Sequence, residues 1–158
     1  MELNEHIPTT AALIVAAGRG LRAGGAGPKQ WQDLNGVMIA RRTALKFLNH
    51  PNISRVLVVI HQDDGPYANT AFAGLNVETT IGGDTRATSV LAGLEALARH
   101  APDHILIHDV ARPCVSAKII DAVCDALIIS QGAAPALAVT DALWSGADAH
   151  VTGTQDRS

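Results

Sequence analysis

Short apolar runs alternate with longer amphipathic segments along most of this 158-residue chain. The runs AALIVAA and VLVVI contain no polar residue, which is typical of strands that are covered on both faces of a sheet. We predict strands at residues 11–17, 55–60, 76–81, 104–109 and 133–139, and helices at about 38–49, 64–73, 86–100 and 116–130. This order predicts an α/β fold, a mostly parallel and twisted sheet with helices on both faces.

The composition fits one compact domain. Hydrophobic residues make up 47% of the chain, and a chain of this length can bury about 70% of its unfolded surface. The formal net charge is -3 and no stretch combines basic with aromatic residues, which argues against a nucleic-acid partner. Cys114 and Cys124 lack metal-ligand spacing, the polar start MELNEHIPTT does not resemble a signal peptide, and no apolar run approaches the roughly 20 residues of a membrane span. We therefore expect a cytoplasmic protein without a membrane segment.

The loop after the first predicted strand, GRGLRAGGAGPKQ, contains a weak dinucleotide-binding pattern. Gly18, Gly20 and Ala23 satisfy the spacing G-x-G-x-x-A, but that pattern requires a helix that continues through its third small residue. The glycines that follow, together with Pro28, make such a helix improbable. The P-loop pattern is also absent, because no Gly-Lys-Ser/Thr occurs. Neither common nucleotide-binding motif therefore explains this loop.

The same loop can hold phosphate groups in another way. Its glycines allow backbone N–H groups to approach phosphate oxygens, and Arg19, Arg22 and Lys29 provide positive charge. The alternative is a glycine-rich connector whose cations are solvated. Ligands of doubly wound sheets bind beyond the carboxyl ends of the strands, which is where this loop lies.

The loop after the third predicted strand, IGGDTRATSV, has a similar character. Gly82 and Gly83 permit a close backbone approach, and Asp84 can accept a hydrogen bond from a ribose hydroxyl or a base amine. Ser89 falls in the first turn of the next helix. The alternative is an ordinary helix start with Asp84 or Thr85 as the N-cap.

The loop after the fourth predicted strand, ILIHDVARPC, presents an acid and a cation together. Asp109 falls at the carboxyl end of the strand, and Arg112 follows in the turn. An acid in this position commonly orients a metal ion or a substrate hydroxyl, and the alternative is a surface ion pair. Each loop alone is weak evidence, but three such loops at one edge of a sheet indicate a ligand site.

The motifs of these loops, in this order, resemble those of the 2-C-methyl-D-erythritol 4-phosphate cytidylyltransferases. The resemblance covers nearly the whole chain and rests on AAGRGLR, PKQ, GGDTRATSV, HDVARP, the TD of Thr140 and Asp141, and TQDR. It implies a Rossmann-like nucleotidyltransferase fold. The run AAGRGLRAGG is similar to forms of this domain that are fused ahead of a cyclodiphosphate synthase.

The resemblance implies transfer of CMP from CTP to methylerythritol phosphate, with release of pyrophosphate and with magnesium as the cofactor. It implies that Arg22 and Lys29 stabilise the transition state. The nucleotide would be bound by Ala16, Ala17, Gly18, Gly83, Asp84 and Ser89, and the acceptor by Asp109 and Arg157, with Asp109 also a candidate metal ligand. The open alternatives are a nucleotidyltransferase with another base or acceptor, and an inactive nucleotide-binding fragment.

The resemblance also implies a division of the chain. Residues 1–139 would form the nucleotide-binding core, and residues 140–158 would begin an extended dimerisation arm, although a frayed end is the alternative for this stretch. In the family, the partner subunit's arm supplies the residue that Arg157 matches, so we expect a homodimer. Two departures are that Ala23 and Ala142 stand where the family usually has a large apolar and a hydroxyl residue. Family domains also continue further, so we expect this chain to be a fragment of a longer enzyme, truncated at the C-terminus.

Overall fold

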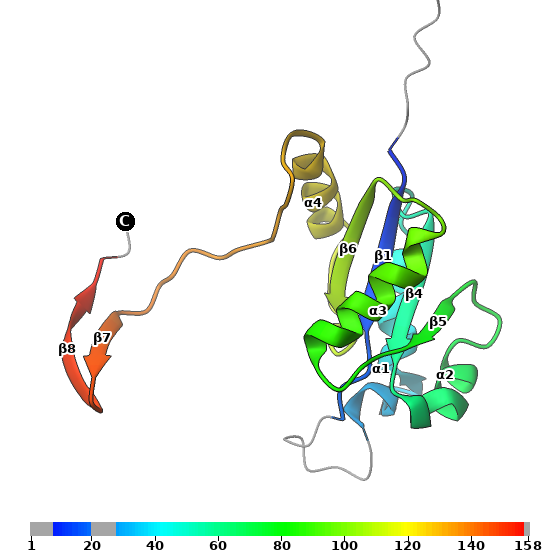
Figure 1. The fold of residues 1–158 in the computed structure, drawn as a ribbon, viewed down its shortest axis with the longest axis horizontal. Helices are drawn as coiled ribbons and strands as arrows, with labels where there is room; N and C mark the ends of the chain where they lie inside the picture. The colour runs from blue at the N-terminus through cyan, green and yellow to red at the C-terminus, as the bar shows by residue number, and fades with distance from the viewer. Residues whose placement is uncertain (1–7, 20–27, 157–158) are drawn as a thin grey trace, which may run out of the picture.

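A four-stranded parallel sheet forms the centre of the molecule (Figure 1). The computed structural model describes residues 8–19 and 28–156. The strands lie in the order β5-β4-β1-β6, so that β1 occupies an interior position between β4 and β6. Their bounds are β1 Thr10–Val15, β4 Arg55–Ile60, β5 Glu78–Ile81 and β6 His104–Asp109. The parallel sheet is confirmed, and four of the five predicted strands begin and end within two residues of these bounds.

Helices cover both faces of this sheet, as the sequence predicts. Their bounds are α1 Ile39–Leu48, α2 Gly65–Ala71, α3 Arg86–Ala98 and α4 Ala117–Ile129. Side chains of β1 alternate between two hydrophobic clusters, as the period of a strand requires. Ala11 and Leu13 pack in a cluster with Leu97 of α3, whereas Ala12 and Ile14 pack on the opposite face with residues of α1, α2 and α4.

Local hydrogen bonds explain where the two long helices begin. Thr85 precedes α3 and forms a reciprocal capping box with Thr88, and the Ser116 hydroxyl accepts from the N–H of Ile119 at the start of α4. Thr85 is therefore the N-cap of α3, and Asp84 is not. Gly93 lets α3 approach the sheet closely, because a Cβ at this position would lie 2.6 Å from Leu13 Cδ1.

Short elements connect the sheet and the helices. They are the 3-10 helices η2 (Lys29–Trp31) and η3 (Gln62–Asp64) and the strands β2 (Asp33–Leu34) and β3 (Val37–Met38). The turn between β2 and β3 is Asn35–Gly36, with φ values of 52° and 75°. A two-residue hairpin turn with positive φ at both positions favours this Asn-Gly pair.

The predicted strand at residues 133–139 is wrong. No regular strand occurs there, and these residues are exposed, with Leu137 95% exposed. The run pairs with no described strand, and Pro135 has no N–H to donate to a sheet. An apolar composition is therefore not enough to place this run in the sheet.

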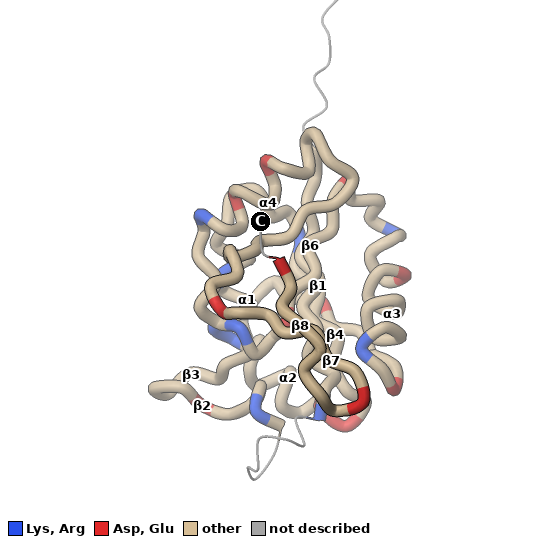
Figure 2. Tube along the Cα trace, turned by 90° about the vertical axis from the view of Figure 1, so that its left-hand side faces the viewer, with Lys and Arg blue, Asp and Glu red and all other residues tan. Residues whose placement is uncertain are grey.

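A two-stranded hairpin follows the exposed run and lies apart from the body of the molecule (Figure 1). It consists of β7 (Leu143–Ala147) and β8 (His150–Gln155), joined by Asp148 and Ala149 at positive φ. Over its described residues the end of the chain is therefore a regular hairpin and not a frayed end. Its described residues include acidic residues at the turn and at the end but no Lys or Arg (Figure 2). None of the helices in the described ranges is long and apolar enough to span a membrane.

Candidate functional site

The three loops singled out from the sequence meet in one open cavity of about 570 Å³. The cavity lies beyond the carboxyl ends of β1, β5 and β6, where ligands of parallel sheets bind. Its lining consists of residues 15–18, 29–30, 83–86, 89 and 109–112. The loops come from distant parts of the chain, and the parallel register of the strands brings them together.

The wall formed by the first loop combines an exposed cation with a fixed backbone. Lys29 is exposed and lines the cavity, whereas its neighbour Gln30 is buried. The Gln30 amide Nε2 donates to the carbonyl oxygens of Ala16 at 2.8 Å and of Gly18 at 2.9 Å. The N–H of Ala16 donates to the Val59 carbonyl oxygen at 2.7 Å, which continues the sheet into the loop. Ala16, Ala17 and Gly18 all line the cavity.

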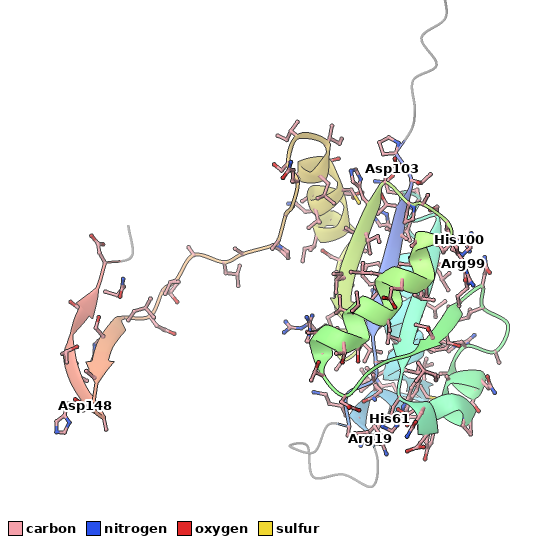
Figure 3. The ribbon with its side chains drawn as sticks, viewed as in Figure 1. Arg19, His61, Arg99, His100, Asp103 and Asp148 are labelled. Carbon is pink, nitrogen blue, oxygen red and sulfur yellow. The ribbon has the colours of Figure 1, made fainter. Side chains whose placement is uncertain are left out.

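Arg19 does not line this cavity, although the sequence made it a candidate phosphate ligand. Its Nη1 lies 3.0 Å from Oδ1 of the buried Asp64 and 3.3 Å from Nδ1 of His61 (Figure 3). The Asp64 carboxylate neutralises this guanidinium, so Arg19 anchors the start of the loop to η3. The other two cationic candidates, Arg22 and Arg157, lie outside the described residues.

The wall formed by the second loop depends on a close approach of the Gly82 backbone to neighbouring side chains. A Cβ at Gly82 would lie 2.6 Å from Ser89 Oγ and 2.8 Å from the Ala17 Cβ, so a glycine is needed here. The buried Ser89 hydroxyl donates to the Gly83 carbonyl oxygen at 3.1 Å and thereby holds the loop against α3. Gly83 and Asp84 line the cavity, and Asp84 is exposed toward solvent.

The wall formed by the third loop contains a carboxylate between two arginines. Arg86 Nη2 donates to Asp109 Oδ1 at 3.1 Å, and Arg112 Nε donates to Asp109 Oδ2 at 3.1 Å. Burial acts to raise the pKa of Asp109, but the two guanidinium groups outweigh it and hold that pKa below its usual value. Asp109 is therefore ionised at neutral pH. Because Arg86 starts α3 and Arg112 follows β6, this cluster joins the second loop to the third.

The charges of the described lining favour an anionic ligand. Lys29, Arg86 and Arg112 contribute three positive charges, and Asp84 and Asp109 contribute two negative ones. The two arginines already share Asp109, whereas no ion pair with another described residue is found for Lys29. The described residues contain no group of three or more His, Cys, Asp or Glu side chains that could hold a metal ion.

Among the charged and amide side chains of the lining, sequence reasoning left out Gln30 and Arg86, and it noted Arg112 only as a cation beside Asp109 without assigning it a role. Gln30, Arg86 and Arg112 stand inside the motifs PKQ, GGDTRATSV and HDVARP, so the motifs contained them. Their partners lie 12 to 23 residues away for Gln30 with Gly18 and for Arg86 with Asp109. For these two pairs the only signal was membership of the motifs, because no local spacing predicts them, whereas Arg112 and Asp109 are only three residues apart.

Known proteins resemble this chain over nearly its whole length. Residues 10–158 match the family model described as 2-C-methyl-D-erythritol 4-phosphate cytidylyltransferase. The chain is 53% identical over 149 residues to a bifunctional enzyme IspD/IspF of Ruegeria pomeroyi, covering 94% of this chain and 39% of that protein. It is 48% identical over 151 residues to a 2-C-methyl-D-erythritol 4-phosphate cytidylyltransferase of Roseobacter denitrificans, covering 93% of this chain and 66% of that protein.

Solved structures agree with these sequence relatives. A crystal structure of 2-C-methyl-D-erythritol 4-phosphate cytidylyltransferase from Thermus thermophilus matches with a TM-score of 0.70 and 30% identity, covering 94% of this chain and 64% of that one. The chain thus spans about two fifths of the bifunctional relative and about two thirds of the shorter proteins.

Proposed function

Because this chain belongs to the 2-C-methyl-D-erythritol 4-phosphate cytidylyltransferase family, we propose that it binds CTP in the three-loop cavity and transfers CMP to methylerythritol phosphate. The observation that carries this proposal is the meeting of the three family motifs around one cavity with an excess of cationic side chains. A nucleoside triphosphate and a phosphorylated acceptor are both anionic, so this charge favours their binding.

The proposed reaction is an in-line displacement at phosphorus. An oxygen of the acceptor phosphate attacks the α-phosphorus of CTP, the bond from that phosphorus to the bridging oxygen breaks, and pyrophosphate leaves. Negative charge accumulates on the bridging and non-bridging oxygens, so catalysis depends on positioning and on fixed positive charge. Lys29 is the described cation that we assign to this task, because it is exposed and lines the cavity. Arg22 belongs to the same proposal by its motif.

Magnesium is part of the proposal as an ion that arrives with the triphosphate. Mg²⁺ is commonly bound by one or two carboxylates together with substrate phosphates, and Asp84 and Asp109 are the carboxylates of the described lining. Each Asp109 oxygen accepts one hydrogen bond from an arginine and keeps a further lone pair that could bind the ion. When bound, the ion neutralises part of the phosphate charge.

The second loop is proposed to hold the cytidine. Gly83 and Asp84 line the cavity, and an exposed carboxylate can accept from a base amine or a ribose hydroxyl. Ser89 contributes by holding the Gly83 carbonyl rather than by presenting its own hydroxyl, because that hydroxyl is buried and donates to this carbonyl.

We extend the proposal to a homodimer formed through the hairpin. The described strand β8 is exposed along its whole length, and Trp144 on β7 is also exposed, which suits a surface that a second subunit covers. Arg157 follows this hairpin and would be delivered to the partner's acceptor site. A cytoplasmic location belongs to the same proposal, because Cys114 and Cys124 are both free thiols, as a reducing compartment favours.

Pyrophosphate release tests the proposed reaction. The chain is incubated with methylerythritol phosphate and Mg²⁺ and with CTP, ATP, UTP or GTP in turn, and mixtures without acceptor or with a chelator serve as controls. We expect release with CTP that depends on the acceptor. Release with another nucleotide but not with CTP would indicate a related nucleotidyltransferase, and tight CTP binding without release would indicate a nucleotide-binding chain without turnover.

A further inference from the structure

The motif PKQW places three consecutive side chains in three different environments. Residues 29–31 form the single 3-10 turn η2, in which successive side chains point about 120° apart. Lys29 faces the cavity, Trp31 packs in the core against Tyr67 and Phe72, and Gln30 is directed between them. Gln30 is only 2% exposed, which is unusual for an amide side chain that lines a cavity.

The buried amide of Gln30 reaches across the loop. Its Nε2 group donates both of its hydrogens, one to the Ala16 carbonyl at 2.8 Å and one to the Gly18 carbonyl at 2.9 Å. These two carbonyls belong to the segment that enters the glycine-rich loop, and Gln30 lies just after the loop. The amide therefore ties the entry of the loop to its exit.

The two hydrogen bonds fix the orientation of two peptide groups. A trans peptide is planar, and its N–H points away from its C=O. The described residues contain no cis peptide bond, so the N–H groups of Ala17 and Arg19 point away from Gln30. Among the described residues, no backbone carbonyl accepts from these N–H groups. The Ala17 N–H belongs to a lining residue and the Arg19 N–H follows the lining residue Gly18, so both are available to a ligand of the cavity, although the Arg19 side chain lies outside it.

We propose that Gln30 is a positioning residue that aims the backbone N–H groups of Ala17 and Arg19 at the phosphates of the bound nucleotide. This inference rests on the proposed function only in identifying the anion as a triphosphate. Oriented backbone N–H groups form anion-binding concavities, and their value depends on being fixed before the ligand arrives. The two hydrogen bonds of Gln30 hold these N–H groups in place, and the Gln30 side chain does not need to contact the ligand itself.

The test compares ligands that carry phosphate groups with one that carries none. Gln30→Met keeps the length of the side chain without a donor and without added charge. The matched control is Gln131→Met, the same change at an exposed position outside the cavity. Dissociation constants are measured for tripolyphosphate, CTP and cytidine. We expect Gln30→Met to weaken tripolyphosphate and CTP about tenfold, as lost hydrogen bonds to charged groups do, and to leave cytidine within about twofold.

A second measurement needs no substitution. In the wild-type chain, amide NMR signals of Ala17 and Arg19 should shift when tripolyphosphate is added. The proposal is overturned if wild type does not bind tripolyphosphate, if Gln30→Met binds it as tightly as wild type, or if the variant loses cytidine affinity to the same extent. The last result would make Gln30 a purely structural residue. If tripolyphosphate binding behaves as expected but CTP is not preferred over other nucleotides, the proposed function fails and the role of Gln30 stands.

Discussion

The body of the molecule, residues 8–19 and 28–130, and its tail, residues 131–156, contain similar apolar sequences, but only the body buries them. In β1 the residues from Ala11 to Ile14 are completely buried, because the strand has neighbours on both edges and helices on both faces. The run at 133–139 has the same kind of composition and is exposed throughout. An apolar composition permits burial, but whether a run is buried depends on the strands and helices that the fold places around it.

The two regions also differ in what they contribute to the site. Each described residue that lines the three-loop cavity belongs to the body. The tail reaches the proposed chemistry only through Arg157 and a partner subunit, and that role stays a prediction. Substitutions at buried or cavity-lining positions of the body should accordingly change stability or ligand binding, and substitutions in the described tail of an isolated subunit should change neither.

The largest effect is expected from shortening a core side chain. Leu13 is completely buried and packs against α3, so Leu13→Ala should lower the free energy of unfolding by about 2 to 5 kcal/mol. Leu137→Ala, the same change on a side chain that is 95% exposed, should change it by less than about 0.5 kcal/mol. Urea unfolding followed by circular dichroism measures both. A loss above about 1 kcal/mol for Leu137→Ala would mean that the tail packs against something in solution.

The core strands could be predicted from the sequence, and the reason is physical. A run such as VLVVI is apolar at every position because both faces of β4 are covered, and the structure places this run between β1 and β5. The predicted strand at 133–139 fails for the complementary reason, since no local pattern reveals whether a partner strand is present. Expectations about long-range pairing therefore need the topology as well as the pattern.

The position of the site could also be predicted, but its internal contacts could not. Parallel strands bring their carboxyl ends together, so three loops with suitable residues were expected to meet, and they do. The loop alone offered Arg19, Arg22 and Lys29 as cations, and only the resemblance singled out Arg22 and Lys29. The structure separates Arg19 from Lys29, because Asp64, 45 residues from Arg19, neutralises Arg19 and leaves Lys29 facing the cavity.

The next effect concerns turnover rather than stability. If Lys29 stabilises charge on the departing pyrophosphate, Lys29→Ala should lower the rate of pyrophosphate release about 10²-fold or more while the unfolding free energy changes little. The matched control is Lys118→Ala, which removes an exposed cation from α4 outside the cavity. Arg22→Ala should have an effect of the same order. If Lys29→Ala releases pyrophosphate at a rate within threefold of wild type, Lys29 is a solvated surface cation without a role in turnover.

A smaller effect is expected where the second loop meets the first. Gly82→Ala would place a methyl group 2.6 Å from Ser89 Oγ and 2.8 Å from the Ala17 Cβ. Overpacking of this kind costs about 1 to 3 kcal/mol, and the displaced loops should also bind CTP more weakly. Gly132→Ala in the tail is the matched control, because a Cβ there would meet no atom within 4 Å. Unfolding curves and CTP titrations that do not distinguish the two variants would show that the loops are not packed as described.

The smallest effect is the acid dependence of the cluster that joins the second and third loops. The arginines beside Asp109 hold its folded-state pKa below the unfolded value of about 3.9, so Asp109 stabilises the fold fully above that pH. The contribution is lost as the pH falls through the folded pKa. The free energy of unfolding of wild type minus that of Asp109→Asn should therefore be largest near pH 6 and decline below about pH 4.

The solvent exposure of Asp109 and its two arginines determines the size of this difference in unfolding free energy and its response to salt. The Asp109 side chain is 39% exposed and both arginines are more exposed, so water screens the pairs and the difference should stay below about 1 kcal/mol. Because the Debye length shortens to about 3 Å at 1 M salt, added NaCl should reduce the difference further. A difference that grows as the pH falls from 6 to 3 would have the wrong sign for a carboxylate held between two guanidinium groups. It would then follow that the second and third loops are not joined through Asp109, and the distinction between a body that assembles the site and a tail that does not would lose one of its supports.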